Sequence, residues 1–375
     1  MRRALLAAVA LFALLAAPVR ASSADAPQVP AAAWYLVGSD GAVLARREAT
    51  RPRAIASITK LMTAVVVLEH ARLGDVVRVD PRAAGVGEST VYLRGGEELT
   101  VEQLLRALLV PSANDAAEAL ALHVGHGSPE RFVALMNAKA AELGLTDTHF
   151  ENPHGLDQAG HVSSARDVTA LLRYALGVPF VRDALQRESV TLPGGRTFPS
   201  TDDLLEGWGP LVAGKTGHTH DAGWSETAAA SRGGATVYGA VLGSGSRGVR
   251  NDALRQLLTY GLDRYRRVQV VDAARVYAAA KTGYGQPVVR LVAPRSIASS
   301  VRIGVPLVER IVAPTALALP VAAGQAVGRV EVYESDRLVA SSNLVAAAAV
   351  ADPGLLAKSR WYAARTARNL WEMLT

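Results

Sequence analysis

The pattern of apolar and polar residues predicts a layered α+β region up to residue 265. Near its start, two apolar stretches, 34–37 and 42–45, flank Gly38-Ser-Asp-Gly41, which is typical of a β-hairpin. Apolar residues then recur with helical spacing in four segments: 61–70, 100–124, 129–143 and 164–177. Further strands and a closing helix are predicted at 211–215, 224–230, 235–242 and 251–265. Strands at both ends with helices between them predict an α+β fold.

The pattern changes after Arg267. From 268 to 350 the chain consists of short Val-rich stretches broken by Pro and Gly. Two of these stretches, 327–333 and 338–344, flank a turn at Glu334-Ser-Asp336 and predict a hairpin. We therefore expect a small all-β domain over 268–350, separate from the domain over 22–265.

The last segment, 352–375, is predicted to form an amphipathic helix. Plotted at about 100° per residue, its charged half carries Lys358, Arg365 and Arg368, with Trp361 on the same side. The other half carries the large apolar residues Leu355, Leu356, Tyr362, Leu370, Trp371, Met373 and Leu374. A basic amphipathic helix with Trp at a chain end is typical of a segment that lies on a membrane surface. The alternative is a helix that packs on the β domain.

The first 21 residues have the pattern of a secretory signal peptide. Arg2 and Arg3 precede an apolar run over 4–17, and Val19-Arg20-Ala21-Ser22 supplies a small-x-small cleavage pattern. A run of about 14 apolar residues is shorter than the roughly 20 that a membrane span needs; an uncleaved anchor helix is the alternative. We therefore expect an exported protein, at the outer face of the cytoplasmic membrane or in the periplasm, where ATP and NAD chemistry is not expected.

Composition narrows the chemistry further. Half of the 375 residues are apolar and a fifth are charged, which is ample for a core and unlike a disordered chain. The chain has no cysteine, so disulfides, thiolate metal sites and a cysteine nucleophile are excluded. The formal charge is +6 and includes three arginines of the leader, so the mature chain is too mildly basic to indicate a nucleic-acid partner.

Ser57-Ile-Thr-Lys60 stands at the start of the 61–70 helix and pairs a nucleophile with a base. A spacing of three places both side chains on one helix face, so Lys60 can reach the Ser57 hydroxyl. The apolar residues that follow Lys60 favour its neutral amine, as a base requires. Backbone N–H groups at a helix N-terminus can also stabilise an oxyanion next to Ser57. By itself this motif is a weak signal.

Two further motifs follow in order. Ser112-Ala-Asn114 combines a hydroxyl and a carboxamide that could relay a proton and hold a substrate amide. Lys215-Thr-Gly217 ends a strand, where a cation, a hydroxyl and a bare backbone could hold a substrate carboxylate. Second copies at 281–283 and 341–343 fall in the predicted β domain without a serine-x-x-lysine motif before them there. The order of the three motifs within one α+β region therefore favours the first copies.

These three motifs resemble the signature of the penicillin-recognising serine enzymes. The residues around them narrow the resemblance to the D-alanyl-D-alanine carboxypeptidases, the low-molecular-mass penicillin-binding proteins. It covers residues 31 to 265 and is carried above all by Ala56-Ser-Ile-Thr-Lys-Leu-Met-Thr-Ala64, Ser112-Ala-Asn-Asp-Ala-Ala117, Asn152-Pro-His-Gly-Leu156 and Ala213-Gly-Lys-Thr-Gly-His-Thr219. The resemblance implies the antiparallel sheet with helices of the serine β-lactamases and transpeptidases.

The resemblance also implies a role for each matching residue. Ser57 would be acylated, Lys60 would activate it, and Ser112 would pass a proton to the leaving amine. Ser112 and Asn114 would line the second wall of the site, and the oxyanion would sit between the backbone N–H groups of Ser57 and His218. The substrate's terminal carboxylate would be bound by Lys215, Thr216 and Gly217, with support from Arg250. A solvated surface arginine is the alternative interpretation of Arg250.

The chain departs from the family pattern at two places. Ile55 stands where the family often has proline, and Glu88-Ser-Thr90 stands in the loop 85–93 where the family favours a serine pair and methionine. The histidine pairs His123-x-x-His126 and His218-x-His220 lack a nearby acid at zincin spacing, so no metal or other cofactor is expected.

The implied function is removal of the terminal D-alanine from peptidoglycan stem pentapeptides, with covalent binding of β-lactams such as penicillin. A D,D-endopeptidase would carry the same three motifs. A β-lactamase would need a glutamate for fast deacylation, and Glu151 lies in a plausible region. A non-catalytic wall-binding module is disfavoured because every proposed catalytic side chain is present.

Overall fold

The computed structural model describes residues 7–13 and 26–374 and divides the chain into two compact units. One unit is Ser23–Arg264, and the other combines Met1–Ser22 with Tyr265–Thr375. The first unit contains all three motifs that carry the expected chemistry.

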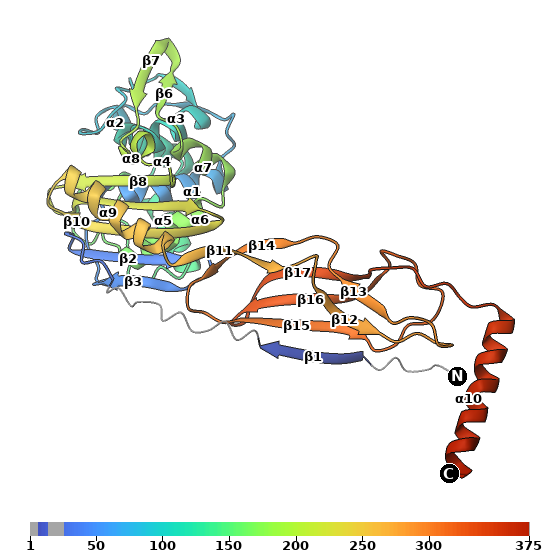
Figure 1. The fold of residues 1–375 in the computed structure, drawn as a ribbon. Coiled ribbons are helices and arrows are strands. Elements are labelled where there is room, and N and C mark those ends of the chain that lie inside the picture. The colour runs from blue at the N-terminus through green and yellow to red at the C-terminus, as the bar shows by residue number, and fades with distance from the viewer. Residues whose placement is uncertain (1–6, 14–25, 375) are drawn as a thin grey trace. The chain divides into compact units, whose positions relative to one another are not determined.

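The first unit is built on a five-stranded antiparallel sheet with strand order β3-β2-β10-β9-β8 (Figure 1). The predicted hairpin is confirmed as β2 (Ala33–Gly38) and β3 (Val43–Arg47), with Gly41 at a φ of +83° in the turn. The three later strands are also confirmed, as β8 (Leu211–Thr219), β9 (Gly223–Arg232) and β10 (Ala235–Ser244). Small two-stranded sheets are added by β4 (Val76–Arg78), β5 (Glu98–Thr100), β6 (Ser189–Leu192) and β7 (Arg196–Pro199).

Side chains point alternately to the two faces of a sheet, and here helices cover both faces. On β10, Tyr238, Ala240 and Leu242 belong to the core shared with the helical cluster. Residues of the other parity face α9 (Arg247–Leu262), where Gly239 meets Leu258. The cluster comprises α1 (Lys60–His70), α2 (Pro81–Ala84), α3 (Val101–Leu109), α4 (Asn114–Val124), α5 (Pro129–Glu142), α6 (Ala165–Ala175), α7 (Pro179–Leu185) and α8 (Leu204–Gly207).

One helix prediction was wrong. The segment 100–124 forms two helices, α3 and α4, rather than one. Pro111 disfavours a helical conformation at the residue before it, and Ser112 has a φ of +65°, so the chain turns between the two helices. The other predicted helices are present with ends shifted by a few residues. The break matters because it carries the second motif.

The second unit is mainly β-structure, as predicted. A six-stranded sheet has the order β1-β15-β16-β17-β13-β12, and β11 pairs with β14. The expected hairpin is β16 (Ala326–Glu334) with β17 (Arg337–Ala346). The remaining strands are β11 (Tyr265–Val271), β12 (Val276–Ala280), β13 (Val289–Val292), β14 (Ile297–Arg302) and β15 (Leu307–Pro314).

Two segments of this unit fall where the sequence predicts export and membrane signals. β1 (Ala7–Ala13) lies within the expected leader and pairs with β15; the other leader residues lie outside the described part of the chain. The chain ends in α10 (Leu355–Leu374), a helix none of whose residues is buried. Across the described residues, every helix is too short or too polar to cross a bilayer.

The start of α3 gives a test of local helix stability. Gln103 N–H donates to Thr100 Oγ1 at 3.2 Å, and Thr100 N–H donates to Gln103 Oε1 at 2.8 Å, which completes a capping box. Thr100→Ala should lower the free energy of unfolding by about 1 kcal/mol, because the Gln103 N–H in the first turn loses its partner. Urea unfolding checks this, and an unchanged midpoint would show that water replaces the cap without loss.

Candidate active site

The three motifs meet in a cleft of about 440 Å³ in the first unit. The residues that line it come from all three motif segments and include Ser57, Ser112 and Thr216, together with Phe198 of β7 and Trp224 of β9. The cleft joins segments that are far apart in the sequence, because β8 passes directly alongside the turn that carries Ser57.

Ser57 lies on a short 3-10 helix, η1 (Ala56–Thr59), that leads into α1. Ala56 has a φ of +48°, a conformation uncommon for a residue with a Cβ and one that the surroundings must stabilise. Two glycines allow close approach to this turn. A Cβ on Gly155 would lie 2.0 Å from the Ala56 carbonyl oxygen, and one on Gly217 would lie 3.1 Å from the Ser57 backbone nitrogen. Any larger residue would push these segments away from the nucleophile.

Lys60 is fully buried, and its Nζ has three polar neighbours. It lies 2.7 Å from Ser57 Oγ, and it donates to Asn114 Oδ1 at 2.6 Å and to the His154 carbonyl at 2.9 Å. The two amide oxygens can only accept, whereas the serine hydroxyl can also donate. A neutral amine therefore satisfies all three neighbours, with two N–H bonds to the amides and its lone pair towards the Ser57 proton.

Electrostatics favour the same state of Lys60. Burial lowers its pKa well below that of free lysine, and the neighbouring cation of Lys215 lowers the pKa further. The carboxylates of Asp115 and Glu88 oppose this shift, but burial dominates. The result is a general base within hydrogen-bond distance of a hydroxyl, which is the arrangement that activates a serine nucleophile.

Ser112 and Asn114 come from the break between α3 and α4. The positive φ of Ser112 directs its side chain towards β8, where Lys215 Nζ donates to Ser112 Oγ at 2.9 Å. Asn114 begins α4 and bridges two segments, because Oδ1 accepts from Lys60 and Nδ2 donates to the Gly87 carbonyl at 2.9 Å. The second motif therefore connects the base, the loop 85–93 and the third motif.

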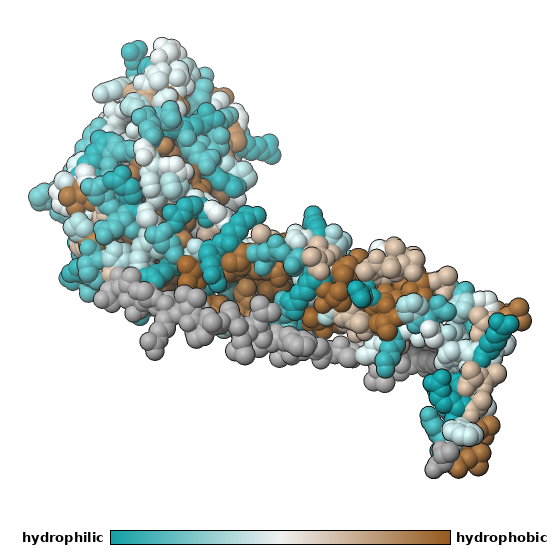
Figure 2. Space-filling model, viewed as in Figure 1, coloured by the Kyte–Doolittle hydropathy of each residue, from teal (hydrophilic) through white to brown (hydrophobic). Residues whose placement is uncertain are grey.

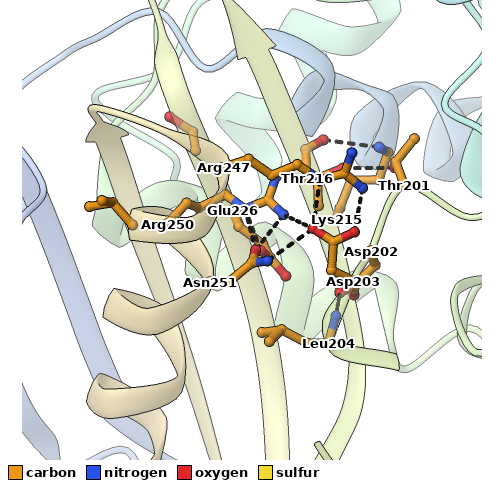
Figure 3. A network of polar contacts seen from close by, with 12 residues as sticks. Thr201, Asp202, Asp203, Leu204, Lys215, Thr216, Glu226, Arg247, Arg250 and Asn251 are labelled. Carbon is orange, nitrogen blue, oxygen red and sulfur yellow. Dashed lines mark hydrogen bonds and ion pairs between the residues drawn. The ribbon is translucent and has the colours of Figure 1, made fainter. Parts of the chain in front are cut away.

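Lys215 lies in the middle of β8 and is almost completely buried. Burial lowers its pKa to about 7, against the opposing influence of the carboxyl groups of Asp202 and Glu226. Next to it, Thr216 Oγ1 lies within hydrogen-bond distance of Thr201 Oγ1, at 2.7 Å (Figure 3). The Thr216 hydroxyl thus lines the cleft, and the Lys215 amine lies just behind it, next to Ser112, as an anion-binding site needs.

His218 and Arg250 flank the far end of the cleft. His218 stacks on Trp224, its cross-strand neighbour, with ring centres 4.0 Å apart. The Arg250 guanidinium lies 5.9 Å from the Trp224 ring centre and is 1% exposed. The alternative of a solvated surface arginine is therefore wrong: Arg250 is a buried cation at the edge of the cleft.

The second copies of the motifs do not take part in this cleft. Lys281 is exposed in the β unit, where its backbone forms an isolated β-bridge with Ala316. Ser341 and Asn343 lie on β17. Glu151, considered as a deacylating base, pairs instead with His149 at 3.2 Å and does not appear among the described residues that line the cleft.

The two departures from the family pattern adjoin the site. Ile55 is fully buried just before η1, and a Cβ on Gly217 would lie 2.7 Å from its carbonyl oxygen. In the loop, Glu88 has a φ of +66°, and the flanking Gly87 and Ser89 carbonyls both accept from Asn114. The unusual loop sequence is thus connected to the residue that orients Lys60.

Several supporting residues were missed by the sequence analysis. The Asp115 carboxylate accepts from the backbone N–H groups of Val91 and Leu93 and so holds the loop 85–93 against α4. Its only sequence signal was its place directly after the second motif. Among the described residues, no group of three or more His, Asp or Glu side chains is placed to hold a metal ion.

His161 is another supporting residue, located behind η1. Its Nδ1 accepts from the Glu151 backbone N–H at 3.1 Å, which leaves Nε2 protonated to donate to Thr59 Oγ1 at 2.7 Å. The neutral ring thus connects the segment after α5 to the residue between Ser57 and Lys60.

Comparison with known proteins agrees with this geometry. The model of a family described as D-alanyl-D-alanine carboxypeptidase matches residues 20–246. The chain is 33% identical to the D-alanyl-D-alanine carboxypeptidase DacD of Salmonella typhimurium, covering 96% of this chain and 97% of the relative. With DacD of Escherichia coli the identity is 31%, over 96% of this chain and 98% of the relative.

Solved structures are similar over the same region. The D-alanyl-D-alanine carboxypeptidase of Mycobacterium tuberculosis superposes with a TM-score of 0.62 at 32% identity, covering 65% of this chain and 95% of that one. Penicillin binding protein 5 of Haemophilus influenzae superposes with a TM-score of 0.63 at 26% identity, covering 87% and 99%. The second likeness extends beyond the first unit.

The buried His161 predicts how stability depends on pH. Burial lowers its pKa from 6.5 to about 4, so the unfolded chain binds the proton more tightly. The neutral ring contributes on the order of 3 kcal/mol to the free energy of unfolding. This contribution is fully present above pH 6.5 and is lost as the pH falls towards 4. Urea unfolding of His161→Gln should show a correspondingly weaker loss of stability over this range. His70→Gln, at an exposed position, is the control that should retain the wild-type loss.

Proposed function

The chain belongs to the D-alanyl-D-alanine carboxypeptidase family of serine peptidases, and we propose that it cleaves the terminal D-alanine from peptidoglycan stem peptides through an acyl-enzyme on Ser57. The observation that carries this assignment is the Ser57–Lys60–Asn114 arrangement, in which a buried amine has its lone pair free for the serine proton. Purified enzyme incubated with a pentapeptide ending in D-Ala-D-Ala should release D-alanine. Cleavage of cross-linked dimers without D-alanine release would indicate an endopeptidase instead.

The first step uses the groups at the floor of the cleft. Lys60 accepts the Ser57 proton as Oγ attacks the carbonyl of the penultimate D-alanine, and the tetrahedral oxyanion forms next to the backbone N–H groups of Ser57 and His218. Gly217 makes this possible because it lets β8 approach the Ser57 nitrogen closely.

The second step returns the proton to the leaving group. Ser112 lies between the cleft and Lys215, with Lys215 Nζ donating to its hydroxyl. An oxygen that accepts from a cation is a good donor of its own proton, so Ser112 can protonate the departing amine of D-alanine. Ser112 then takes up the proton that Lys60 removed from Ser57, and Lys60 becomes neutral again. Water then hydrolyses the acyl-enzyme, again with Lys60 as base.

Recognition of the C-terminal carboxylate falls to the other end of the cleft. Thr216 and Arg250 line the cleft there, and Lys215 lies directly behind Ser112, to whose hydroxyl its Nζ donates. A free terminal carboxylate is what distinguishes the end of a stem peptide from an internal bond. The buried position of both cations strengthens their attraction for an anion that displaces water.

We also propose that the enzyme is exported and held on the membrane surface by α10. The charged side of this helix faces its own unit: Trp361 packs edge-on against Tyr284 at 5.6 Å between ring centres, and Lys358 Nζ lies 5.0 Å from the Tyr284 ring centre. Tyr362 of the apolar half also packs against Tyr284, at 5.9 Å between ring centres. Five large aliphatic side chains of that half are nevertheless more than half exposed: Leu355, Leu356, Leu370, Met373 and Leu374. Figure 2 shows apolar side chains on the surface at both ends of the helix. These exposed apolar side chains favour a lipid partner over the alternative of a helix packed on the β unit.

The nucleophile assignment is tested with a labelled penicillin. Wild-type enzyme should bind the label covalently at one serine, which mass spectrometry of a digest locates. Ser57→Ala should lose the label almost completely rather than partly, because the acyl-enzyme forms on a single oxygen. Label retained by this variant would refute the assignment.

The choice between the two lysine-threonine-glycine copies is tested by a matched pair of variants. Lys215→Ala should lose most carboxypeptidase activity, because the buried cation that holds the carboxylate and polarises Ser112 is gone. Lys281→Ala, at the exposed copy in the β unit, should keep activity close to wild type. The reverse result would contradict the assignment of the carboxylate site.

The anchor is tested by removing α10. A chain ending at Asp352 should keep full activity on a small peptide and should not bind vesicles. The full mature chain should float with anionic vesicles, and added salt should weaken this binding in part, because the helix cations contribute to it. A full chain that ignores such vesicles at low salt would show that the helix has a packing role only.

A further inference from the structure

Two carboxyl groups are buried together next to the strand that carries Lys215. Glu226 lies on β9 opposite Thr216 and is fully buried, and Asp202 precedes α8 and is 7% exposed (Figure 3). Gly214 leaves the space between them: a Cβ there would lie 2.7 Å from Asp202 Oδ2 and 3.1 Å from Glu226 Oε1. The two carboxyl groups therefore face each other across the place of one missing side chain.

Cations face this pair from two elements. Lys215 lies on β8, and Arg250 on α9 has its Nε 2.9 Å from Glu226 Oε2. The third carboxylate, Asp203, is turned towards the surface, where it pairs closely with Arg247 and more loosely with Arg250. Asp203 is the counter-ion of Arg247. Asp202 and Glu226 are therefore the carboxyl groups that can offset the positive charges of Lys215 and Arg250.

Two neighbouring carboxyl groups buried without water disfavour the state in which both are ionised. Burial and their mutual repulsion raise the pKa of Glu226 well above that of free glutamate, and burial raises the pKa of Asp202. Within the described part of the chain, Asp202 Oδ2 and both Glu226 oxygens lack a hydrogen bond of good geometry. One proton on either group would let it donate to the other and would supply the missing bond.

Building on the proposed function of Lys215 and Arg250, we propose that Asp202 and Glu226 share one proton and act together as a counter-ion with a single negative charge. Two cations and one shared negative charge leave the empty site with a net charge of +1. This charge is neutralised by the one carboxylate of the substrate. Full ionisation of the pair would remove the attraction for that carboxylate, and full protonation would leave two cations buried without a partner. Asp202 and Glu226 are thus positioning residues that keep Lys215 protonated.

The shared proton has a distinctive consequence for mutation. In Glu226→Gln the remaining Asp202 can ionise, and in Asp202→Asn the remaining Glu226 can, so either single variant retains the negative charge. Only the double variant loses it. Without that charge the ammonium form of Lys215 is disfavoured, so its proton is lost at a lower pH than in the wild type.

The experiment compares kcat/KM for a D-Ala-D-Ala peptide across pH in the wild type, both single variants and the double variant. Each single variant should stay within about threefold of wild type at pH 7. The double variant should lose on the order of 100-fold, mainly through KM, with its alkaline limb at lower pH and partial recovery on acidification. Equal losses in the two single variants and the double variant, or an unmoved alkaline limb in the double variant, would overturn the proposal.

Infrared spectroscopy detects the proton directly and is independent of activity. At pH 7 the folded wild type should show the carbonyl band of a protonated buried carboxyl group, and both single variants should lack it. Asp203→Asn, which changes the surface-facing carboxylate beside the pair, should retain the band. A wild type without this band would overturn the shared proton. The thermal unfolding midpoint confirms that each variant is folded, as expected for substitutions that preserve side-chain shape.

Lys215→Ala separates this proposal from the function on which it rests. If that variant keeps its activity, the carboxylate site is misassigned, and the counter-ion proposal is overturned with it. If Lys215→Ala is inactive while the double variant keeps both its activity and its alkaline limb, only the counter-ion is overturned.

Discussion

The burial of Lys60 beside Ser57 is the constraint on which the rest of the site depends. An amine at the surface would be protonated at neutral pH and would hold a proton rather than accept one. Here the loop around Gly155, the start of α4 and the strand β8 close over η1, and burial lowers the pKa of Lys60. Asn114 and the His154 carbonyl accept its two N–H bonds, so the lone pair is directed at the serine.

A second constraint is the amount of positive charge in one small cleft. Lys60, Lys215 and Arg250 are all almost completely buried, and three buried cations would repel one another strongly. The site gives these groups different surroundings: Lys60 is neutral, whereas carboxyl groups next to Lys215 and Arg250 favour the charged forms of both. Because the Lys215 cation is one cause of the lowered pKa of Lys60, binding of the carboxylate and activation of the serine are electrostatically coupled.

The fold provides the rigid surroundings that such a site requires. Ser57, Ser112 and Lys215 come from η1, from the α3–α4 break and from β8. Close backbone packing holds β8 against η1, and buried side chains such as His161 and Asn114 add hydrogen bonds. In the second unit, Trp361 and Tyr362 both pack against Tyr284, while Leu355 and Leu374 at the two ends of α10 stay exposed.

Much of this protein follows from its sequence alone. Helical periodicity predicted α1, α5 and α6, turn residues predicted the hairpins, and the order of three motifs selected Ser57, Lys60, Ser112 and Lys215. Local pattern did not predict the break at Ser112, where a positive φ interrupts an apolar run that looks continuous. Nor did it find His161 or the pair of Asp202 and Glu226, because these residues carry no local signal. Their roles arise from burial next to segments distant in sequence. Only the tertiary structure determines which ionisable groups are buried side by side, where water does not screen their charges.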